Sequence, residues 1–454
     1  MKSYTFWTLA SLAGAIGAAF LLSSASSSKR EKPLQKPNSK KIFSRKSSTL
    51  QKIVQKNVDL WLAFSGEEQG NLAPCGCSEG LLGGLMRRDS LLQFLRKCTP
   101  VLPVAMGDWL ERPNRHGQIK LKYLQQAASK MRYSLACLGE LDLALWKARL
   151  SLPVPRPLAA NVFTGAKPLF SSYRVVEVSQ KRLGFIGVLG KEFLPDTIAL
   201  GLELKDPLQV SAKVAQRLRP QVDFLILLWH GTPPSNPPTW ADLTVGGHRS
   251  EKFFFDSKKK LLRTVQKAKG VALIGLRFLE DEVRMERFQE GYLDDFVPDS
   301  PRMLRLYRRY VQEVAQAGLS IEKERRFAQG VFYVGSQRCL ACHSYAANVW
   351  KNSAHAHAFA TLKQKGQHKN PDCLTCHTVG YRYYTGYENE QLTSHLKNVG
   401  CESCHGPGSE HVRLPQKGYG RTRGKATCLL CHTPDNSPKF RFSQYYPKIR
   451  HSSP

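Results

Sequence analysis

The feature that most constrains this chain is a cysteine–histidine pattern that occurs four times after residue 338. Each copy reads C-x-x-C-H, in which two thiols can add to the vinyl groups of a haem and the next histidine can bind its iron. One copy could be half of a zinc site, but four with His directly after the second Cys indicate c-type haem attachment. We therefore predict four covalent haems, each bound on one side by the histidine of its motif. The attachment residues are Cys339, Cys342 and His343, Cys373, Cys376 and His377, Cys401, Cys404 and His405, and Cys428, Cys431 and His432.

The spacing of the motifs predicts the architecture of residues 331–454. The motifs begin at 339, 373, 401 and 428, which leaves about 25 to 30 residues for each haem. That is too little chain for a conventional core, so the porphyrins would supply much of the apolar interior. We expect a mostly helical and irregular multihaem domain with short helices and long loops.

Further histidines in this region are candidates for the opposite, distal side of each iron. Of the 13 histidines, four lie in the motifs, and six of the other nine lie in the haem region. They are His355, His357, His368, His395, His411 and His451. His357 is two residues from His355, so the two cannot serve the same iron, and His368 in a Gly/Lys-rich loop is expected to be solvated.

The residues around the motifs carry a second, longer pattern. Its marks are Val334-Gly335, the run Trp350-Lys-Asn-Ser-Ala-His355-Ala-His357-Ala, and Val399-Gly-Cys401-Glu-Ser-Cys404-His405-Gly-Pro-Gly-Ser-Glu-His411. From Tyr333 to about His451 the chain resembles the tetrahaem cytochrome c family of the five-fifty-four type. The resemblance implies electron transfer and makes His355 and His411 the favoured distal ligands, ahead of His357, His395 and His451. It also allows one five-coordinate haem, which would be a site for a small molecule.

The N-terminus predicts export. Residues 1–28 have Lys2, an uncharged apolar run and small residues at Ser23-Ser24-Ala25, which is the layout of a signal peptide or of an N-terminal anchor helix. Residues 29–56 carry ten Lys or Arg and one acid, Glu31, and are expected to be a flexible basic linker. Either form of the N-terminus places the rest of the chain in the periplasm or another extracytoplasmic space.

The strong positive charge of the chain indicates what kind of partner it binds, but it says nothing about the fold. Lys and Arg number 67 against 36 Asp and Glu, for a net charge of +31. We expect redox partner proteins with acidic surfaces and attraction to a membrane surface, and no nucleic acid, because an exported chain without a further recognition motif gives no reason for it.

The middle of the chain alternates short apolar runs with amphipathic segments, which predicts an α/β domain over 57–295 with helices covering its sheets. The expected strands are 58–64, 101–106, 183–189, 224–229 and 271–274, and the expected helices include 85–97 and 121–136. A connecting helix is expected within 296–330, where apolar residues recur at helical spacing from Met303 to Ala317.

The loops after these strands carry polar residues. They include Gly70-Asn71-Leu72, Gly83-Gly84-Leu85-Met86-Arg87-Arg88, Gly107-Asp108, Gly139 with Asp142, Ala160-Asn161-Val162, His230 and Gly246-Gly247-His248. These loops resemble those of calcineurin-like metallophosphoesterases of the 5′-nucleotidase branch, in which two metals polarise a phosphate and activate water.

This chain departs from that family at most of its ligand positions. Glu67-Glu68-Gln69 stands where the family has Asp-x-His, Gly139-Glu140-Leu141-Asp142 where it has Gly-Asn-His-Asp or Gly-Asn-His-Glu, and Ser250 replaces a histidine. We therefore expect a degenerate domain without phosphohydrolase activity. One metal could remain on Asp108, His230 and His248, with Glu67 as a poor substitute ligand. The alternative is that both histidines are hydrogen-bonded loop residues.

Four cysteines lie outside the haem region: Cys75, Cys77, Cys98 and Cys137. Cys75 and Cys77 are too close to bridge each other without strain, but each could pair with Cys98 or Cys137 in an oxidising compartment. A small metal site is the alternative, and spacing does not decide between them.

These observations predict an exported electron carrier with four haems, joined to a metallophosphoesterase-like domain used for docking or scaffolding. Two alternatives stay open. One is a haem enzyme that acts on a small nitrogen or sulfur compound at a five-coordinate haem, and the other is a metal-dependent phosphohydrolase with an attached cytochrome.

Overall fold

The computed structural model describes residues 57–74, 80–154, 156–319, 325–420 and 422–451. All of them fall in one unit that spans residues 47–454. The expected export segment, the basic linker, Cys75 and Cys77 lie outside the described residues. Within the described residues, no helix is both long and apolar enough to cross a membrane.

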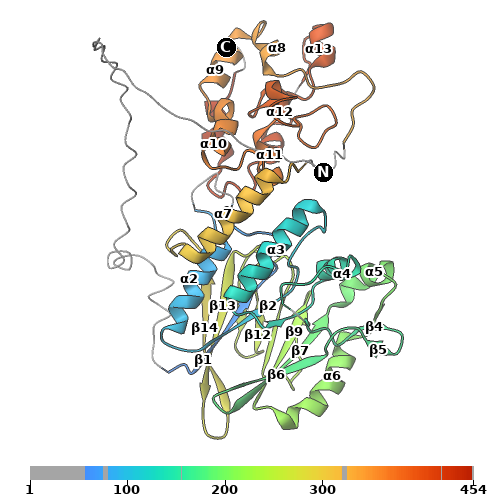
Figure 1. Cartoon of the computed structure of the whole chain (residues 1–454), viewed down its shortest axis with the longest axis vertical. Coiled ribbons are helices and arrows are strands. Elements are labelled where there is room, and N and C mark those ends of the chain that lie inside the picture. The colour runs from blue at the N-terminus through green and yellow to red at the C-terminus, as the bar shows by residue number, and fades with distance from the viewer. Residues whose placement is uncertain (1–56, 75–79, 155, 320–324, 421, 452–454) are drawn as a thin grey trace, which may run out of the picture. The chain divides into compact units, whose positions relative to one another are not determined.

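Two mixed β-sheets form the centre of the middle region (Figure 1). The five-stranded sheet has the order β14 (Val283–Tyr292), β13 (Gly270–Phe278), β1 (Leu60–Ser65), β2 (Val101–Ala105), β3 (Leu135–Ala136). The six-stranded sheet has the order β11 (Phe254–Asp256), β12 (Leu261–Arg263), β10 (Leu243–Gly247), β9 (Phe224–His230), β7 (Lys181–Leu189), β6 (Tyr173–Val178). A small third sheet has the order β5 (Lys167–Pro168), β4 (Val162–Thr164), β8 (Glu203–Leu204).

Strand β1 shows how the layers pack, because all six of its residues are buried. Leu60, Leu62 and Phe64 join a core that also contains residues of β7, β9 and β10. Trp61 and Ala63 point the other way, into a core shared with helices. Since successive side chains of a strand face opposite sides, the first sheet is covered by the second sheet on one face and by helices on the other.

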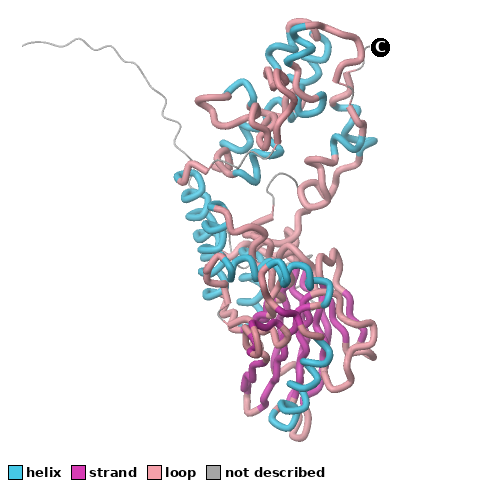
Figure 2. The backbone as a smooth tube through the Cα atoms, turned by 90° about the vertical axis from the view of Figure 1, so that its right-hand side faces the viewer, coloured by secondary structure: helices cyan, strands magenta, loops and turns pink. Residues whose placement is uncertain are grey.

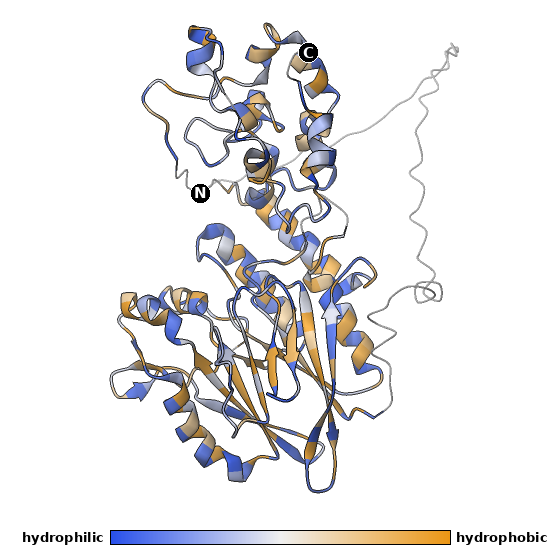
Figure 3. Ribbon diagram, turned by 180° about the vertical axis from the view of Figure 1, so that it is seen from behind, coloured by the Kyte–Doolittle hydropathy of each residue, from blue (hydrophilic) through white to orange (hydrophobic). Residues whose placement is uncertain are grey.

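Helices cover the outer faces of the two sheets. On the outer face of the first sheet lie α2 (Leu85–Arg96), α3 (Arg115–Lys130) and α7 (Pro301–Gln316), and α6 (Pro207–Leu218) covers the second sheet. Helix α3 begins earlier than the expected segment 121–136, because the Asn114 side chain caps it by accepting the Gly117 N–H at 2.8 Å. The expected connecting helix is α7, whose Leu306, Tyr310 and Val314 pack into the helical layer. The α/β fold class expected for this region is confirmed, and its hydrophobic residues concentrate along the central strands (Figure 3).

The C-terminal part of the described chain consists of short helices and long loops, as expected (Figure 2). Its α-helices are α8 (Ser336–Leu340), α9 (Ser344–Lys351), α10 (Ala358–Gln364), α11 (Pro371–His377), α12 (Cys401–His405), α13 (Ser409–Arg413), α14 (Lys425–Cys428) and α15 (Phe442–Tyr445). A small apolar cluster of Tyr333, Phe359, Leu374, Tyr387 and their neighbours is its own core. Such a small core leaves room for a cofactor to contribute apolar surface.

Candidate functional site: a haem region and a buried ligand cluster

Three of the four motif histidines face a second histidine. The ring centres of His343 and His411 are 6.1 Å apart, and those of His432 and His355 are also 6.1 Å apart. The rings of His405 and His451 are 5.7 Å apart. In each pair one member comes from an attachment motif and the other from a distant segment of the chain.

These spacings fit two imidazoles on opposite sides of one iron. A metal–imidazole nitrogen bond is about 2 Å long, and the ring centre lies about 1.2 Å beyond the nitrogen, so two trans imidazoles have centres roughly 6.4 Å apart. The observed 5.7 to 6.1 Å is close to this value. The donor set therefore fits haem iron bound by two histidines.

Hydrogen bonds orient several of these rings. The Nδ1 atom of His377 lies 2.8 Å from the Ala358 carbonyl, that of His405 lies 2.6 Å from the Gly420 carbonyl, and that of His451 lies 2.8 Å from the Ile449 carbonyl. Donation of the Nδ1 proton to a carbonyl leaves Nε2 with its lone pair, which is the arrangement common among metal-binding histidines.

Burial also favours the neutral imidazole that binds metal. It lowers the pKa of His355, His377 and His432 below the ordinary value for histidine. For His355, the positive charge that His432 and His377 would carry lowers the pKa further.

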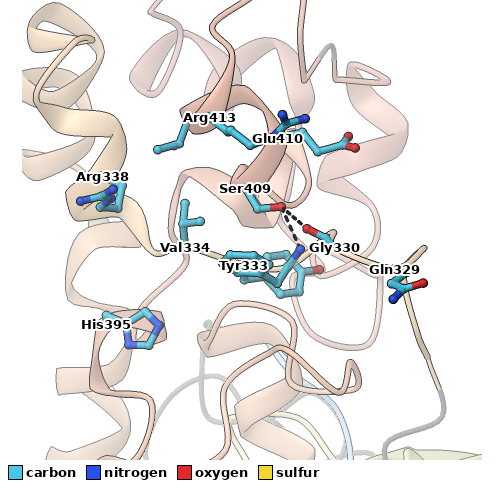
Figure 4. Close-up of a pocket in the computed structure, with 11 residues that line it drawn as sticks. Gln329, Gly330, Tyr333, Val334, Arg338, His395, Ser409, Glu410 and Arg413 are labelled. Carbon is cyan, nitrogen blue, oxygen red and sulfur yellow. Dashed lines mark hydrogen bonds between the residues drawn. The ribbon is translucent and has the colours of Figure 1, made fainter.

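A cavity of about 630 Å³ lies beside the first motif (Figure 4). Arg338, which directly precedes Cys339, lines one part of it, and α13 residues on either side of His411 line another. The volume is within the range of about 300–1,000 Å³ that cofactor pockets occupy. Arg338 and Arg413 would offer positive charge to the propionates of a haem held there.

The distal candidates fall into two groups in the structure. His355, His411 and His451 lie opposite motif histidines. His357 and His395 are exposed, and His395 lines the cavity of Figure 4. His368 differs from the expectation of a solvated residue: it is partly buried, with its ring 6.3 Å from that of Phe359.

A second group of polar side chains meets in the middle region, at the carboxyl ends of strands. Glu67 follows β1, Asp108 follows β2, His230 ends β9 and His248 follows β10. One ligand atom of each lies within 4.8 Å of those of the other three. The structure thus brings together the three expected metal ligands and Glu67.

Glu140, at the start of α4 (Glu140–Lys147), belongs to the same group, although the sequence comparison counted it as a lost ligand. One carboxylate oxygen lies 2.6 Å from His230 Nε2 and the other 3.7 Å from His248 Nε2. Burial raises the pKa of Glu140, but the hydrogen bond and charge of His230 outweigh it and bring the pKa to about 2. Its negative charge therefore faces both histidines.

The group is oriented by its surroundings. His230 Nδ1 lies 2.6 Å from the Met106 carbonyl, so Nε2 points toward the carboxylates. One Asp108 oxygen accepts the Leu141 N–H at 3.0 Å, whereas Oδ2 is buried without a hydrogen bond from the described residues. Burial raises the pKa of Asp108 to about 7. A divalent cation would neutralise the carboxylates and could bind Asp108 Oδ2. Ligand groups that combine imidazoles and carboxylates suit zinc or another transition metal.

The positions that would hold a second metal in the family do not supply one here. Gln69 donates a hydrogen bond from Nε2 to Glu67 at 3.1 Å, and the Ser250 hydroxyl donates to the Lys252 carbonyl at 2.8 Å. Leu141 has no donor atom. The described residues therefore form one compact ligand group.

Cys98 and Cys137 are free thiols. Cys137 is fully buried, and burial raises its pKa to about 11, so it is an unreactive core residue. Within the described residues neither thiol forms a disulfide, and the possible partners Cys75 and Cys77 lie outside them.

The C-terminal region is similar to known proteins. A family model described as "Cytochrome c554 and c-prime" matches residues 338–406, which include the first three motifs. Cytochrome c-554 of Nitrosomonas europaea is 34% identical over 110 residues, or 21% of this chain and 47% of that protein. This region is therefore similar to a haem-binding cytochrome c, and the chain covers less than half of that relative.

Similar solved structures cover both parts of the chain. A 5′-nucleotidase precursor from Thermus thermophilus has a TM-score of 0.46 and 18% identity, and the match covers 68% of each chain. Reduced cytochrome c554 from Nitrosomonas europaea has a TM-score of 0.22 and 25% identity over 26% of this chain and 84% of that one.

Proposed function

We propose that this chain is an exported multihaem c-type cytochrome that carries electrons through four covalently bound haems. The observation that carries the proposal is the set of three histidine pairs, His343 with His411, His432 with His355 and His405 with His451. The similarity of residues 338–406 to the cytochrome c554 family supports it.

The residues of this chain account for the properties that an electron carrier needs. Haem iron supplies the redox couple. The paired cysteines fix each porphyrin, and a histidine on each side keeps the coordination unchanged when the iron changes charge, so little rearrangement opposes electron flow. Hydrogen bonds from Nδ1 of His405 and His451 hold those rings in place.

The fourth motif offers a surface for a redox partner. The two residues between its cysteines, Leu429 and Leu430, are 41% and 74% exposed, whereas Leu374 and Glu402 at the corresponding first position of motifs two and three are buried. Residues 412–451 contain nine Lys or Arg and one acid, Asp435. An exposed apolar spot within a basic segment suits a partner with an acidic rim.

We further propose that the middle region is a scaffold that does not hydrolyse nucleotides. Two ion pairs join it to the haem region: Lys120 of α3 with Asp372 of α11 at 2.7 Å, next to the second motif, and Lys267 with Asp435 at 2.5 Å, after the fourth. Gln69, Leu141 and Ser250 stand at ligand positions of the resembled family and give no second metal group.

A second candidate role for the middle region is to bind one divalent metal. The buried Asp108 Oδ2, together with Glu140, His230 and His248, favours this over a hydrogen-bonded loop pair. Glu67 would complete the group.

Two measurements on the full-length protein test these proposals. Intact mass and the haem absorption spectrum should show four haems per chain, with at least three in the low-spin state; no added haem mass would refute the cytochrome. A metal-loaded preparation should hold one metal per chain outside the haems and hydrolyse no nucleotide. Turnover that disappears in His248→Ala would favour the phosphohydrolase alternative, and small-molecule binding to a high-spin haem would favour the haem enzyme.

A further inference from the structure

Glu402 is a buried acid inside the third attachment motif. It lies on α12 between Cys401 and Cys404 and is 4% exposed. Its carboxylate does not pair with a basic side chain anywhere in the described ranges. A buried carboxylate is costly unless its oxygens receive hydrogen bonds, so its contacts show what stabilises it.

Three backbone amides donate to the two oxygens of Glu402. Oε1 accepts the N–H of Val334 at 2.9 Å and that of Gly408 at 2.7 Å, and Oε2 accepts the N–H of Gly335 at 2.7 Å. These three bonds satisfy both oxygens of the carboxylate. Glu402 is therefore a negative charge held inside the haem region by neutral donors.

These contacts join two attachment motifs that are far apart in sequence. Gly335 is the residue before α8, and α8 carries Cys339 of the first motif. A further bond runs from the Cys401 N–H to the Ser336 hydroxyl at 3.1 Å. The third motif is thus fixed against the start of the first, with the carboxylate between them.

We propose that Glu402 is a positioning residue that holds the first and third haem attachment sites together and lowers the reduction potential of the adjacent haems. A negative charge in a poorly polarisable interior stabilises the more positive, oxidised iron over the reduced iron. The proposal rests on the proposed function, because it requires haems at these motifs.

Two variants separate the charge from the length of the side chain. Glu402→Gln keeps the length but removes the charge and one of the two acceptor oxygens, and Glu402→Asp keeps the charge and both oxygens but shortens the reach toward the three amides. Glu388, an exposed acid of the same region, provides a matched control in Glu388→Gln.

Potentials are measured by spectroelectrochemical titration of the full-length holoprotein, and haem content by intact mass. Glu402→Gln should keep four haems. It should shift the equilibrium between the oxidised and reduced forms of at least one haem tenfold or more toward the reduced form, which raises the reduction potential by about 59 mV for a one-electron couple. Glu402→Asp should keep the wild-type potentials but unfold at a lower temperature, and Glu388→Gln should match wild type in both.

Each other outcome also decides the proposal. If Glu402→Gln does not accumulate while Glu402→Asp does with its haems, the carboxylate is required to hold the two attachment sites together, which supports the positioning role. Unchanged potentials in a four-haem Glu402→Gln protein, or loss of both variants, would refute it and leave Glu402 a packing residue. Wild-type protein without haem would instead refute the proposed function itself.

Discussion

Replacing His411 by alanine tests the pairing of histidines across the haem irons. The His343 and His411 ring centres are 6.1 Å apart, against roughly 6.4 Å for two imidazoles on one iron. Each imidazole can serve one iron, so the variant should lose the distal ligand of one haem and no other. That iron would become five-coordinate or bind water, and therefore high-spin.

The expected magnitude is one additional high-spin haem per chain, a quarter of the haems attached at the four motifs. Electron paramagnetic resonance of the oxidised protein measures the spin states, and intact mass checks that all four haems remain. His357→Ala is the matched control, because His357 is an exposed histidine of the same region and should leave the spectrum unchanged.

A double variant tests whether the pairs are independent. His451 faces His405 and not His343, so His411→Ala combined with His451→Ala should give two additional high-spin haems. An unchanged spectrum in His411→Ala would refute the pairing and direct attention to His395. A double variant with only one additional high-spin haem would refute the independence of the two sites.

Three further changes test other parts of the structure. Cys342→Ser should lower covalent haem by one per chain in intact mass, or prevent accumulation, because one thioether bond is lost; full haem content would contradict the motif assignment. Glu140→Gln should reduce the bound metal from one per chain to a small fraction by elemental analysis, since it removes a charged oxygen beside His230 and His248; unchanged metal content would exclude Glu140 as a ligand. Glu68→Gln should destabilise the chain by about 3–5 kcal/mol in chemical denaturation, because it leaves the fully buried Arg88 guanidinium without its counter-charge; a loss below about 1 kcal/mol, as at an exposed pair, would contradict this.

The sequence predicted five inner strands, β1, β2, β7, β9 and β13, but it missed the edge strands and also the inner strands β10 and β12. The run 224–229 is apolar throughout because β9 lies in the middle of its sheet and is buried on both faces. Strands β6 and β14 lie at sheet edges, and each has exposed charged residues, such as Arg174 in β6 and Arg284 in β14. Strand β6 is held in its sheet by backbone hydrogen bonds to β7, and β14 by backbone hydrogen bonds to β13. The hydrophobicity of the side chains does not predict this backbone pairing.

The metal group was only partly predictable for a related reason. Asp108, His230 and His248 were predicted because they match ligand positions of the resembled family, and the structure places them at the carboxyl ends of β2, β9 and β10. Glu140 was set aside because it replaces another residue type of the resembled family. Its carboxylate nevertheless reaches His230 Nε2 at 2.6 Å, since it begins a helix directly after β3. Glu140 shows that a residue that differs from the family's ligand can still bring a carboxylate to the same group of side chains.

The candidate distal histidines show that distance along the chain does not predict which motif histidine they face. His411 lies six residues after His405 and His355 lies twelve after His343, yet the structure pairs His411 with His343 and His355 with His432. A motif histidine would hold one side of its iron, so a ligand on the opposite side would come from another segment of the chain. His451, which the sequence ranked among the weaker candidates, meets this requirement by facing His405 at 5.7 Å. The enrichment of histidine in residues 331–454 could therefore predict that candidate distal ligands are present, but which motif histidine each of them faces depends on how the loops between the motifs cross in space.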